Sequence, residues 1–187
     1  MPKPPENWLR AWRMDDAPML LAAAQELSLQ QQFVQPITSL DEAEKWIQDR
    51  GADSAAGTAH AWAICGENDE ALGLVTVSHI EPRHSTGWVA YWLLPQARGK
   101  GLAVRSVRAI SRWAFDELGL FRLELGHRVD NTASCRVARA AGYAAEGIER
   151  SRLRYGDKRY DVERHARLAT DPEPGEVTGR NGFPGRS

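Results

Sequence analysis

The chain has few cysteines, no marked excess of either charge and no long apolar run. Only Cys65 and Cys135 occur among its 187 residues, and they do not make a disulfide framework or a metal site. The formal net charge of −1 excludes a bulk electrostatic attraction to nucleic acid or to an anionic membrane. No apolar run approaches the length of a transmembrane helix, and the segment 1–5 lacks the features of a signal peptide. We therefore expect a cytoplasmic protein, with neither nucleic acid nor a membrane as partner and with no bound metal.

The hydrophobic content of 42% is enough to bury one good core in a chain of this length, so one domain is expected. The proline-rich segment 1–7 is predicted to be a leader outside that domain. The segment 170–187 contains Pro, Gly, Glu and Arg without periodicity, and we expect it to be a disordered tail.

Hydrophobic periodicity predicts an α/β order of elements. Ser39 and Glu42 form a capping box at the start of one helix, and Gly51 is expected to end it. A small-residue loop is expected at 53–58, before three strands that form a β-meander. Strands are expected at about 8–13, 59–65, 71–78, 87–94, 122–128, 143–151 and 159–168, and helices at about 16–29, 39–51, 102–118 and 132–140.

The most informative stretch runs from Tyr91 to Ala103. An apolar strand stops at Pro95, because proline lacks the N–H that a continuing central strand needs. Gly99 and Gly101 then precede an amphipathic helix at once. The start of such a helix carries free N–H donors and the positive end of the helix dipole. The stretch therefore predicts an anion site, for which phosphate is the usual occupant.

Two common phosphate loops do not fit this stretch. A nucleotide P-loop ends in Lys-Ser or Lys-Thr, whereas Leu102 follows Gly101 here. The dinucleotide fingerprint needs a third glycine near Val104. The pattern Gln96-x-x-Gly99-x-Gly101 instead resembles the pyrophosphate loop of the GNAT family of acetyl-CoA-dependent N-acetyltransferases. A plain tight turn before a helix is the alternative for this stretch taken alone.

A second stretch has the order strand, Asn cap, short helix and Gly-aromatic turn, with Asn131, Ser134 and Gly142-Tyr143 at its key points. Taken singly, these residues could be a plain helix cap, a solvated serine and a helix stop. Their order and spacing resemble the RimJ/RimL-like branch of the GNAT family, and the resemblance extends over about Trp8 to Leu168. It implies a GNAT domain at 8–168 with the α/β (α+β) acyl-CoA N-acyltransferase fold, in which a mixed, mostly antiparallel sheet is splayed at its middle and flanked by helices.

The resemblance implies acetyl-CoA as co-substrate. Asn131 would hydrogen-bond its pantetheine arm, and a backbone N–H near Leu93 would stabilise the oxyanion. The strand end at Leu93 and Leu94 would pair with the same arm. The backbone N–H groups that would hold the pyrophosphate are those of Arg98, Gly99, Lys100, Gly101, Leu102 and Ala103.

The acid and base of the reaction are less well marked. Many members of the family place an acidic tyrosine seven residues after the Asn, where this chain has Ala138. The resemblance to this branch implies Ser134 as the acid, and a water relay is an equal alternative. The glutamate that serves as base in some members falls near Arg152 here, which leaves Glu81, Glu124, His79 and a water chain open. Cys135 has no partners for a thiol mechanism and is expected to pack.

The predicted activity is transfer of an acetyl group from acetyl-CoA to a primary amine by direct attack. The acceptor implied by the resemblance is a protein N-terminus or a small molecule such as a polyamine, an amino acid or an antibiotic. The loop 29–38 and the turn 152–160 are expected to build its pocket, and a homodimer is left open. The alternative from a different class is a non-catalytic acyl-CoA-binding sensor, which would keep the glycine loop but lack acid and base.

Overall fold

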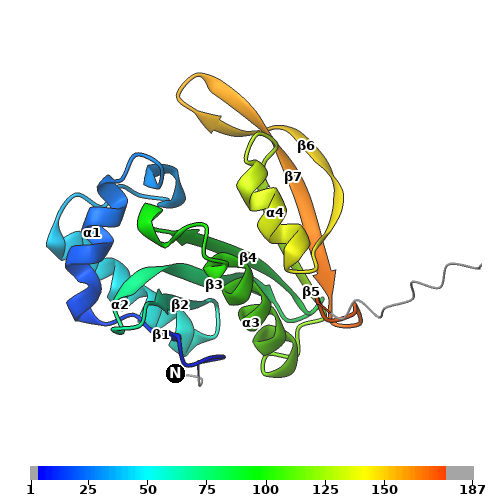
Figure 1. Ribbon diagram of the computed structural model, residues 1–187, viewed down its shortest axis with the longest axis horizontal. Coiled ribbons are helices and arrows are strands. Elements are labelled where there is room, and N and C mark those ends of the chain that lie inside the picture. Colours follow the sequence, from blue (N-terminus) through cyan, green and yellow to red (C-terminus); the bar gives the residue numbers. More distant parts are fainter. Residues whose placement is uncertain (1–3, 176–187) are drawn as a thin grey trace, which may run out of the picture.

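The computed structural model describes residues 4–175. Its centre is a seven-stranded sheet with the order β1-β2-β3-β4-β5-β7-β6 (Figure 1). Neighbouring strands are antiparallel except β4 and β5, which are parallel. The strands are β1 (Leu9–Ala11), β2 (His60–Cys65), β3 (Ala71–Glu81), β4 (Thr86–Leu93), β5 (Arg122–Arg128), β6 (Ala144–Tyr155) and β7 (Lys158–Leu168).

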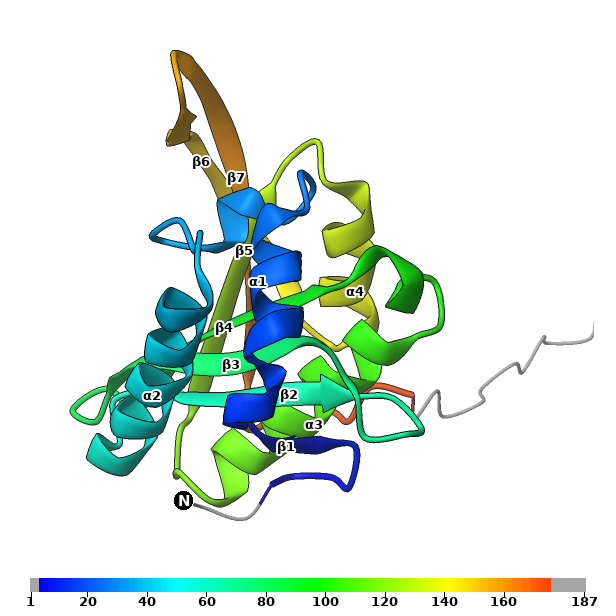
Figure 2. The same ribbon diagram turned by 90° about the vertical axis from the view of Figure 1, so that its left-hand side faces the viewer.

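Two pairs of helices cover the two faces of the sheet (Figures 1 and 2). On one face, α1 (Ala17–Gln25) and α2 (Leu40–Ala56) pack on a core that includes Trp12, Leu74 and Trp92. On the other, α3 (Leu102–Asp116) and α4 (Thr132–Ala140) pack on a core built from alternate residues of the same strands. The mixed, mostly antiparallel fold predicted from the sequence is confirmed.

The helices on the first face differ in length from the prediction. The capping box of Ser39 and Glu42 is formed as expected. However, α2 passes through Gly51 and ends at Gly57, whose φ of 71° is the left-handed conformation suited to a helix stop. An interior glycine costs only about 1 kcal/mol, and the buried Ser54 bonds His60 at 3.0 Å, so the expected loop at 53–58 is wrong. The α1 helix ends early, at Gln25 rather than near Leu29.

The sheet splays between β4 and β5. Backbone pairing joins these strands only at Thr86–Arg122, Gly87–Leu123 and Trp88–Glu124. Beyond Trp88 the two strands have no further pairing, whereas β5 stays paired with β7 as far as Arg128. A gap therefore opens inside the sheet, as the resemblance implied.

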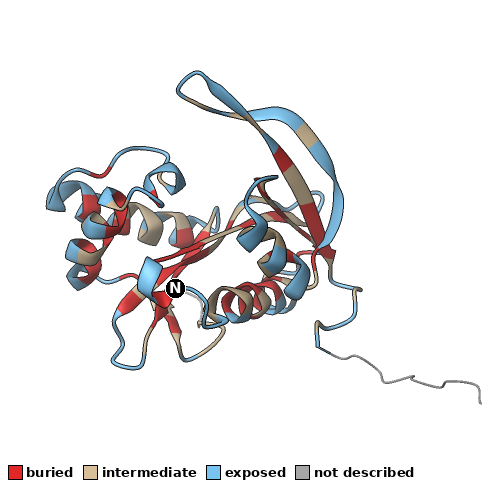
Figure 3. Cartoon of the chain, turned by 45° about the horizontal axis from the view of Figure 1, so that its top comes forward, coloured by how far each residue is buried: buried red, intermediate tan, exposed pale blue. Residues whose placement is uncertain are grey.

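The β6–β7 hairpin extends beyond the layered body, and most of β6 is exposed (Figure 3). The expected turn at 155–157 forms its tip, but β6 runs on to Tyr155 rather than ending at Ser151. The outer parts of the predicted leader and tail, residues 1–3 and 176–187, lie outside the described residues. Within residues 4–175, no helix is long and apolar enough to cross a membrane.

Candidate functional site

The glycine loop leads from the end of β4 into α3. Gly99 and Gly101 have φ values of 76° and 75°, and an added Cβ at either position would meet nothing within 4 Å. Glycine is therefore needed here for backbone conformation and not for space. Between residues 4 and 175, no protein group accepts a hydrogen bond from the backbone N–H groups of Gly99 to Ala103. These free donors at a helix start fit the pyrophosphate of acetyl-CoA.

Arg98 has a different place from the rest of that loop. Its backbone N–H already donates to the carbonyl of Pro95 at 3.2 Å. Its side-chain Nε donates to the carbonyl of Leu93 at 3.0 Å, and Nη2 to Ser28 Oγ at 2.8 Å. The guanidinium thus joins the end of β4 to the segment after α1, and the free amides of the loop begin at Gly99.

The end of β4 presents its amides to both sides. The backbone N–H of Leu94 donates to the carbonyl of Leu72 on β3 at 2.9 Å. Because successive amides of a strand point to opposite sides, the N–H of Leu93 points toward the gap. That is the direction required of an oxyanion donor.

Asn131 and Ser134 stand on the opposite side of the gap, at the start of α4. The Asn131 side chain caps the helix by accepting a hydrogen bond from the backbone N–H of Ser134. Both residues line a cavity of about 670 Å³ that lies between β4 and β5 and also contacts Tyr91 and His127. The structure therefore brings the predicted Asn and Ser together at the gap.

Tyr91 joins this group, although the sequence analysis gave it no role. Burial raises the pKa of Tyr91, and the nearby Ser134 side chain lowers it in part. The Tyr91 hydroxyl is buried and makes no hydrogen bond of standard geometry to any residue in the described range. A signal existed, because period-2 alternation along the strand places Tyr91 on the same face as Val89 and Leu93.

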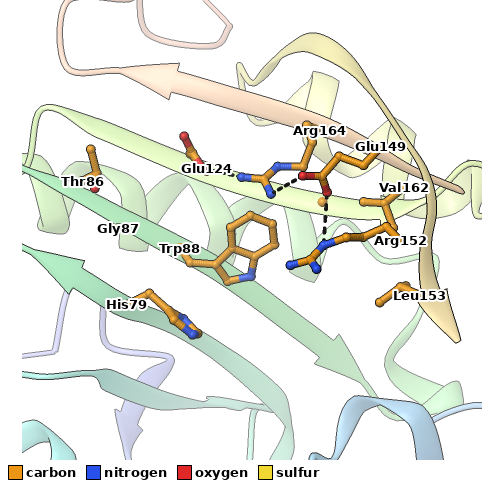
Figure 4. Close-up of a pocket in the computed structure, with 11 residues that line it drawn as sticks. His79, Thr86, Gly87, Trp88, Glu124, Glu149, Arg152, Leu153, Val162 and Arg164 are labelled. Atoms are coloured by element: carbon orange, nitrogen blue, oxygen red, sulfur yellow. Dashed lines mark hydrogen bonds and ion pairs between the residues drawn. The ribbon is translucent and has the colours of Figure 1, made fainter.

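A second cavity, of about 380 Å³, lies on the face of the sheet that carries Trp88 and Glu124 (Figure 4). Charged side chains from β5, β6 and β7 converge there. Arg164 pairs with Glu124 and, at 3.4 Å, with Glu149. Arg152 lies 3.5 Å from Glu149, and the Arg164 guanidinium stacks 4.4 Å from the Trp88 ring. The cavity thus balances acidic and basic groups.

The cavity separates the residues considered as bases. His79 and Glu124 line it, whereas Glu81 is not among its lining residues. Glu124 is held by Arg122, at 2.7 Å, and by Arg164. Glu149, three positions before Arg152, also lines the cavity.

Glu149 is held less tightly than Glu124. Its Oε2 is buried and accepts no hydrogen bond of standard geometry from the residues that the structure describes, and its contact with Arg152 Nε is 3.5 Å long. Glu149 and Arg152 line the same cavity, and the pairing of β6 with β7 is irregular between Glu149 and Leu153. Sequence spacing does not predict that irregularity.

The loop and turn expected to build the acceptor pocket both reach the gap. Gln31 and Gln32 line the larger cavity, together with Leu153 and Tyr155. Arg152 and Leu153 line the smaller one. The two cavities share Trp88, so the gap is accessible from both faces of the sheet.

Comparison with known proteins gives one family for this arrangement. Residues 8–144 match the model of the acetyltransferase (GNAT) domain. The ribosomal-protein-serine acetyltransferase of Escherichia coli (strain K12) is 30% identical over 137 residues, which is 73% of this chain and 74% of that protein.

Solved structures agree with that match. RimL, a ribosomal L7/L12 alpha-N-protein acetyltransferase in complex with coenzyme A, superposes with a TM-score of 0.76 at 26% identity, covering 86% of this chain and 92% of RimL. A spermidine N-acetyltransferase from Vibrio cholerae, in complex with CoA and spermine, gives a TM-score of 0.77 at 20% identity, covering 87% and 95% of the two chains. At 20% identity, the likeness to the spermidine N-acetyltransferase establishes a common fold alone.

Proposed function

Because this chain belongs to the GNAT family of acetyltransferases and is an acetyl-CoA-dependent N-acetyltransferase, we propose that the gap between β4 and β5 is where the thioester meets the acceptor amine. The observation that carries the proposal is the splay itself. Pairing of β4 and β5 stops at Trp88, and a cavity lies on each side of that point. Membership of an acetyltransferase family favours an enzyme over a non-catalytic sensor.

In this proposal the co-substrate lies on the α3–α4 side. The free amides of Gly99 to Ala103 would bind the pyrophosphate, and the Leu93 N–H would face the thioester carbonyl. Asn131 would donate its side-chain amide to the pantetheine arm, because its oxygen is already used in capping α4. Lys100, exposed beside the loop, adds positive charge near the phosphates.

Ser134 and Tyr91 together would protonate the leaving thiolate. The amine nitrogen forms a bond to the carbonyl carbon, the carbon–sulfur bond breaks, and the sulfur takes one proton. A serine hydroxyl alone is a weak acid at neutral pH. A buried tyrosine that keeps its proton, close to that serine, can supply the proton through it.

Glu149 is our proposed base on the acceptor side. The attacking amine must lose a proton, and a carboxylate oxygen without a hydrogen-bond donor is able to accept it. Glu124 is less suited, because its contacts with Arg122, at 2.7 Å, and with Arg164 are short hydrogen bonds, whereas the two arginine contacts of Glu149 are 3.4 and 3.5 Å long. Arg152 would orient Glu149 through their ion pair.

The charges of the smaller cavity favour the amino terminus of a protein or peptide as acceptor. A polyamine carries several cations. Once Glu149 has taken the proton of the reacting amine, Arg152 and Arg164 face a single carboxylate, Glu124, and would repel a second ammonium group. A peptide brings one amine and a neutral backbone that can bond to either arginine or carboxylate. The E. coli relative is named for acting on a ribosomal protein, which supports this choice.

The experiment is a thiol-release assay with acetyl-CoA and two acceptors, a peptide with a free amino terminus and spermidine. We expect kcat/KM for the peptide to exceed that for spermidine by at least about tenfold, since one unfavourable charge contact costs about 1.4 kcal/mol or more. The same peptide with a blocked amino terminus is the matched control. Equal or better use of spermidine would overturn the acceptor assignment.

Two further proposals follow the resemblance. We place the protein in the cytoplasm, supported by the free thiols Cys65 and Cys135, and fractionation of cells tests this. A homodimer is proposed from the resemblance alone, and light scattering would distinguish it from a monomer of 20.8 kDa.

A further inference from the structure

Four side chains that the acetyl-transfer site does not use converge between the sheet and α4. His127 comes from β5, Glu163 and His165 from β7, and Cys135 from α4. One ligand atom from each lies within 4.8 Å of all the others. His127 is paired directly with Glu163 in the sheet, so their side chains leave the same face side by side.

Backbone carbonyls fix the protons of both imidazoles. His127 Nδ1 lies 2.9 Å from the carbonyl oxygen of Arg128, and His165 Nδ1 lies 3.3 Å from that of Tyr143. A carbonyl oxygen can only accept, so each Nδ1 must carry the hydrogen. In the neutral rings both Nε2 atoms therefore present lone pairs.

These lone pairs point at one another and at a carboxylate. The two Nε2 atoms are 3.1 Å apart. Glu163 Oε2 lies 3.0 Å from His165 Nε2 and 3.3 Å from His127 Nε2. Three acceptors so close together repel unless a positive species lies among them. The thiol of Cys135, 3.5 Å from the same oxygen, has one weakly acidic hydrogen and is too poor a donor to balance all three.

We propose that this cluster is a binding site for a divalent transition-metal ion of the Zn²⁺ class. Two imidazoles, a carboxylate and a thiolate are ligands that Zn²⁺ prefers, and a tetrahedron with its usual bond lengths sets ligand atoms roughly 3.3–3.7 Å apart. Four of the six distances between ligand atoms, 3.0 to 3.5 Å, are close to that spacing, and the sulfur lies within 4.8 Å of both imidazole nitrogens. The thiolate and the carboxylate also balance the two charges of the ion.

The surroundings fit a metal site as well. The histidines are buried, with 6% and 1% of their surfaces exposed for His127 and His165. The Nδ1–H of each ring donates a hydrogen bond to a backbone carbonyl oxygen, which is the usual outer-sphere arrangement of a metal-bound histidine. Cys135 and Glu163 are half-buried and leave a way in. Four protein ligands close the site, so the metal has a structural role.

Such an ion would fix α4 against the sheet. Cys135 follows Ser134 directly, and His127 lies one residue before the end of β5, the strand that leads to Asn131. The metal would therefore set the position of both residues at the gap. A count of cysteines does not predict this site, because the pairing of β5 with β7 brings three of its ligands together and the packing of α4 adds Cys135.

The rival occupant is a proton, which would convert one histidine to an imidazolium bonded to Glu163.

The test uses the full chain stripped of metal with a chelator. Co²⁺ titration should give an absorption band from thiolate-to-metal charge transfer that saturates at one equivalent. Zn²⁺, measured by competition with a chromogenic chelator, should also bind one equivalent. Zn²⁺ at about 100 times its dissociation constant should raise Tm by about 5–10 °C.

The variants make the result specific. C135S should abolish the charge-transfer band, and both C135S and E163Q should weaken Zn²⁺ binding at least about tenfold. C65S is the matched control, because Cys65 lies in β2, in the core beneath α1 and α2. This variant should keep both the charge-transfer band and the affinity for Zn²⁺. Absence of one-to-one Zn²⁺ binding in the wild-type chain, or a band that survives C135S, would overturn the proposal and favour the proton.

Discussion

Asn131 Oδ1 accepts a hydrogen bond from the backbone N–H of Ser134 at 3.0 Å. The side chain that starts α4 is thus held beside the residue proposed to donate a proton. This hydrogen bond stabilises the start of α4 and holds both side chains at the gap. The two residues have different proposed roles, so their substitution should affect kcat and the KM for acetyl-CoA differently.

Ser134→Ala should lower kcat and kcat/KM together, because its hydroxyl acts mainly in the transition state. General acid catalysis is typically worth about 10²–10⁴-fold, and a water substitute reduces the loss toward the lower figure. Steady-state kinetics with chemistry shown to be rate-limiting is the measurement. An unchanged kcat would remove Ser134 from the mechanism.

Asn131→Ala is the contrasting change. We expect a higher KM for acetyl-CoA with a smaller effect on kcat, because the bond to the pantetheine arm exists before the reaction. The lost cap should also lower the free energy of unfolding by about 1 kcal/mol. A variant that binds acetyl-CoA normally but is less stable would leave Asn131 with the capping role alone.

Tyr91→Phe should lower kcat about tenfold or more while leaving the affinity for acetyl-CoA nearly unchanged. The substitution removes only a hydroxyl that has no hydrogen-bond partner of standard geometry in residues 4–175, so the fold should not be destabilised. Because burial raises the pKa of Tyr91, the wild-type tyrosine stays protonated at neutral pH and activity should persist as pH rises to 9. Activity of Tyr91→Phe equal to wild type would assign proton delivery to water and Ser134.

Gly101→Asp should abolish binding of CoA. The change puts a carboxylate where the phosphates are expected and forces a residue with a side chain to adopt a φ of 75°. Gly101→Ala isolates the second effect, which costs roughly 1–2 kcal/mol. Calorimetric titration with CoA should show weakened binding in the alanine variant and none in the aspartate variant. Normal binding by Gly101→Asp would place the phosphate site elsewhere.

Asp16→Asn should destabilise the fold by about 3 kcal/mol. Asp16 is 7% exposed and accepts from Arg10 at 2.7 and 2.8 Å, and breaking a buried pair costs about 3–5 kcal/mol. The lower figure applies because Arg10 keeps Asp69 as a partner. Asp15→Asn, at an exposed neighbour, is the control and should change stability by less than about 0.5 kcal/mol. Urea unfolding measures both.

The same pair predicts a dependence on pH. Burial alone would raise the pKa of Asp16, but the hydrogen bonds from Arg10 and Arg13 outweigh it and lower the pKa. Its stabilisation is therefore complete above the unfolded value of about 3.9 and is lost as pH falls below it. The stability gap between wild type and Asp16→Asn should shrink from pH 5 to pH 3, and a constant gap would contradict the assignment.

Local signals gave most of the fold. The capping box at Ser39, the cap at Asn131 and the strand at 122–128 depend on neighbours in sequence, and each was predicted correctly. The error at Gly51 shows the limit of such signals, because whether a glycine ends a helix depends on the backbone conformation that the following residues can sustain.

The site was predicted less completely for a different reason. The glycine loop and the Asn–Ser helix start are local, so spacing and resemblance identified them. Tyr91, Glu149 and the His127–His165 pair come together through strand register and a bulge, which no single stretch of sequence encodes. The groups with proposed roles that were not predicted are therefore those that converge across strands.

The early end of pairing between β4 and β5 has a consequence for the speed of binding. A ligand that enters between two paired strands would first have to break their ladder, and its association would wait for a rare open state. Here the ladder already ends at Trp88, so the site is preorganised in the free chain. Association of acetyl-CoA should then be second order, with a rate rising linearly with concentration and free of a conformational plateau.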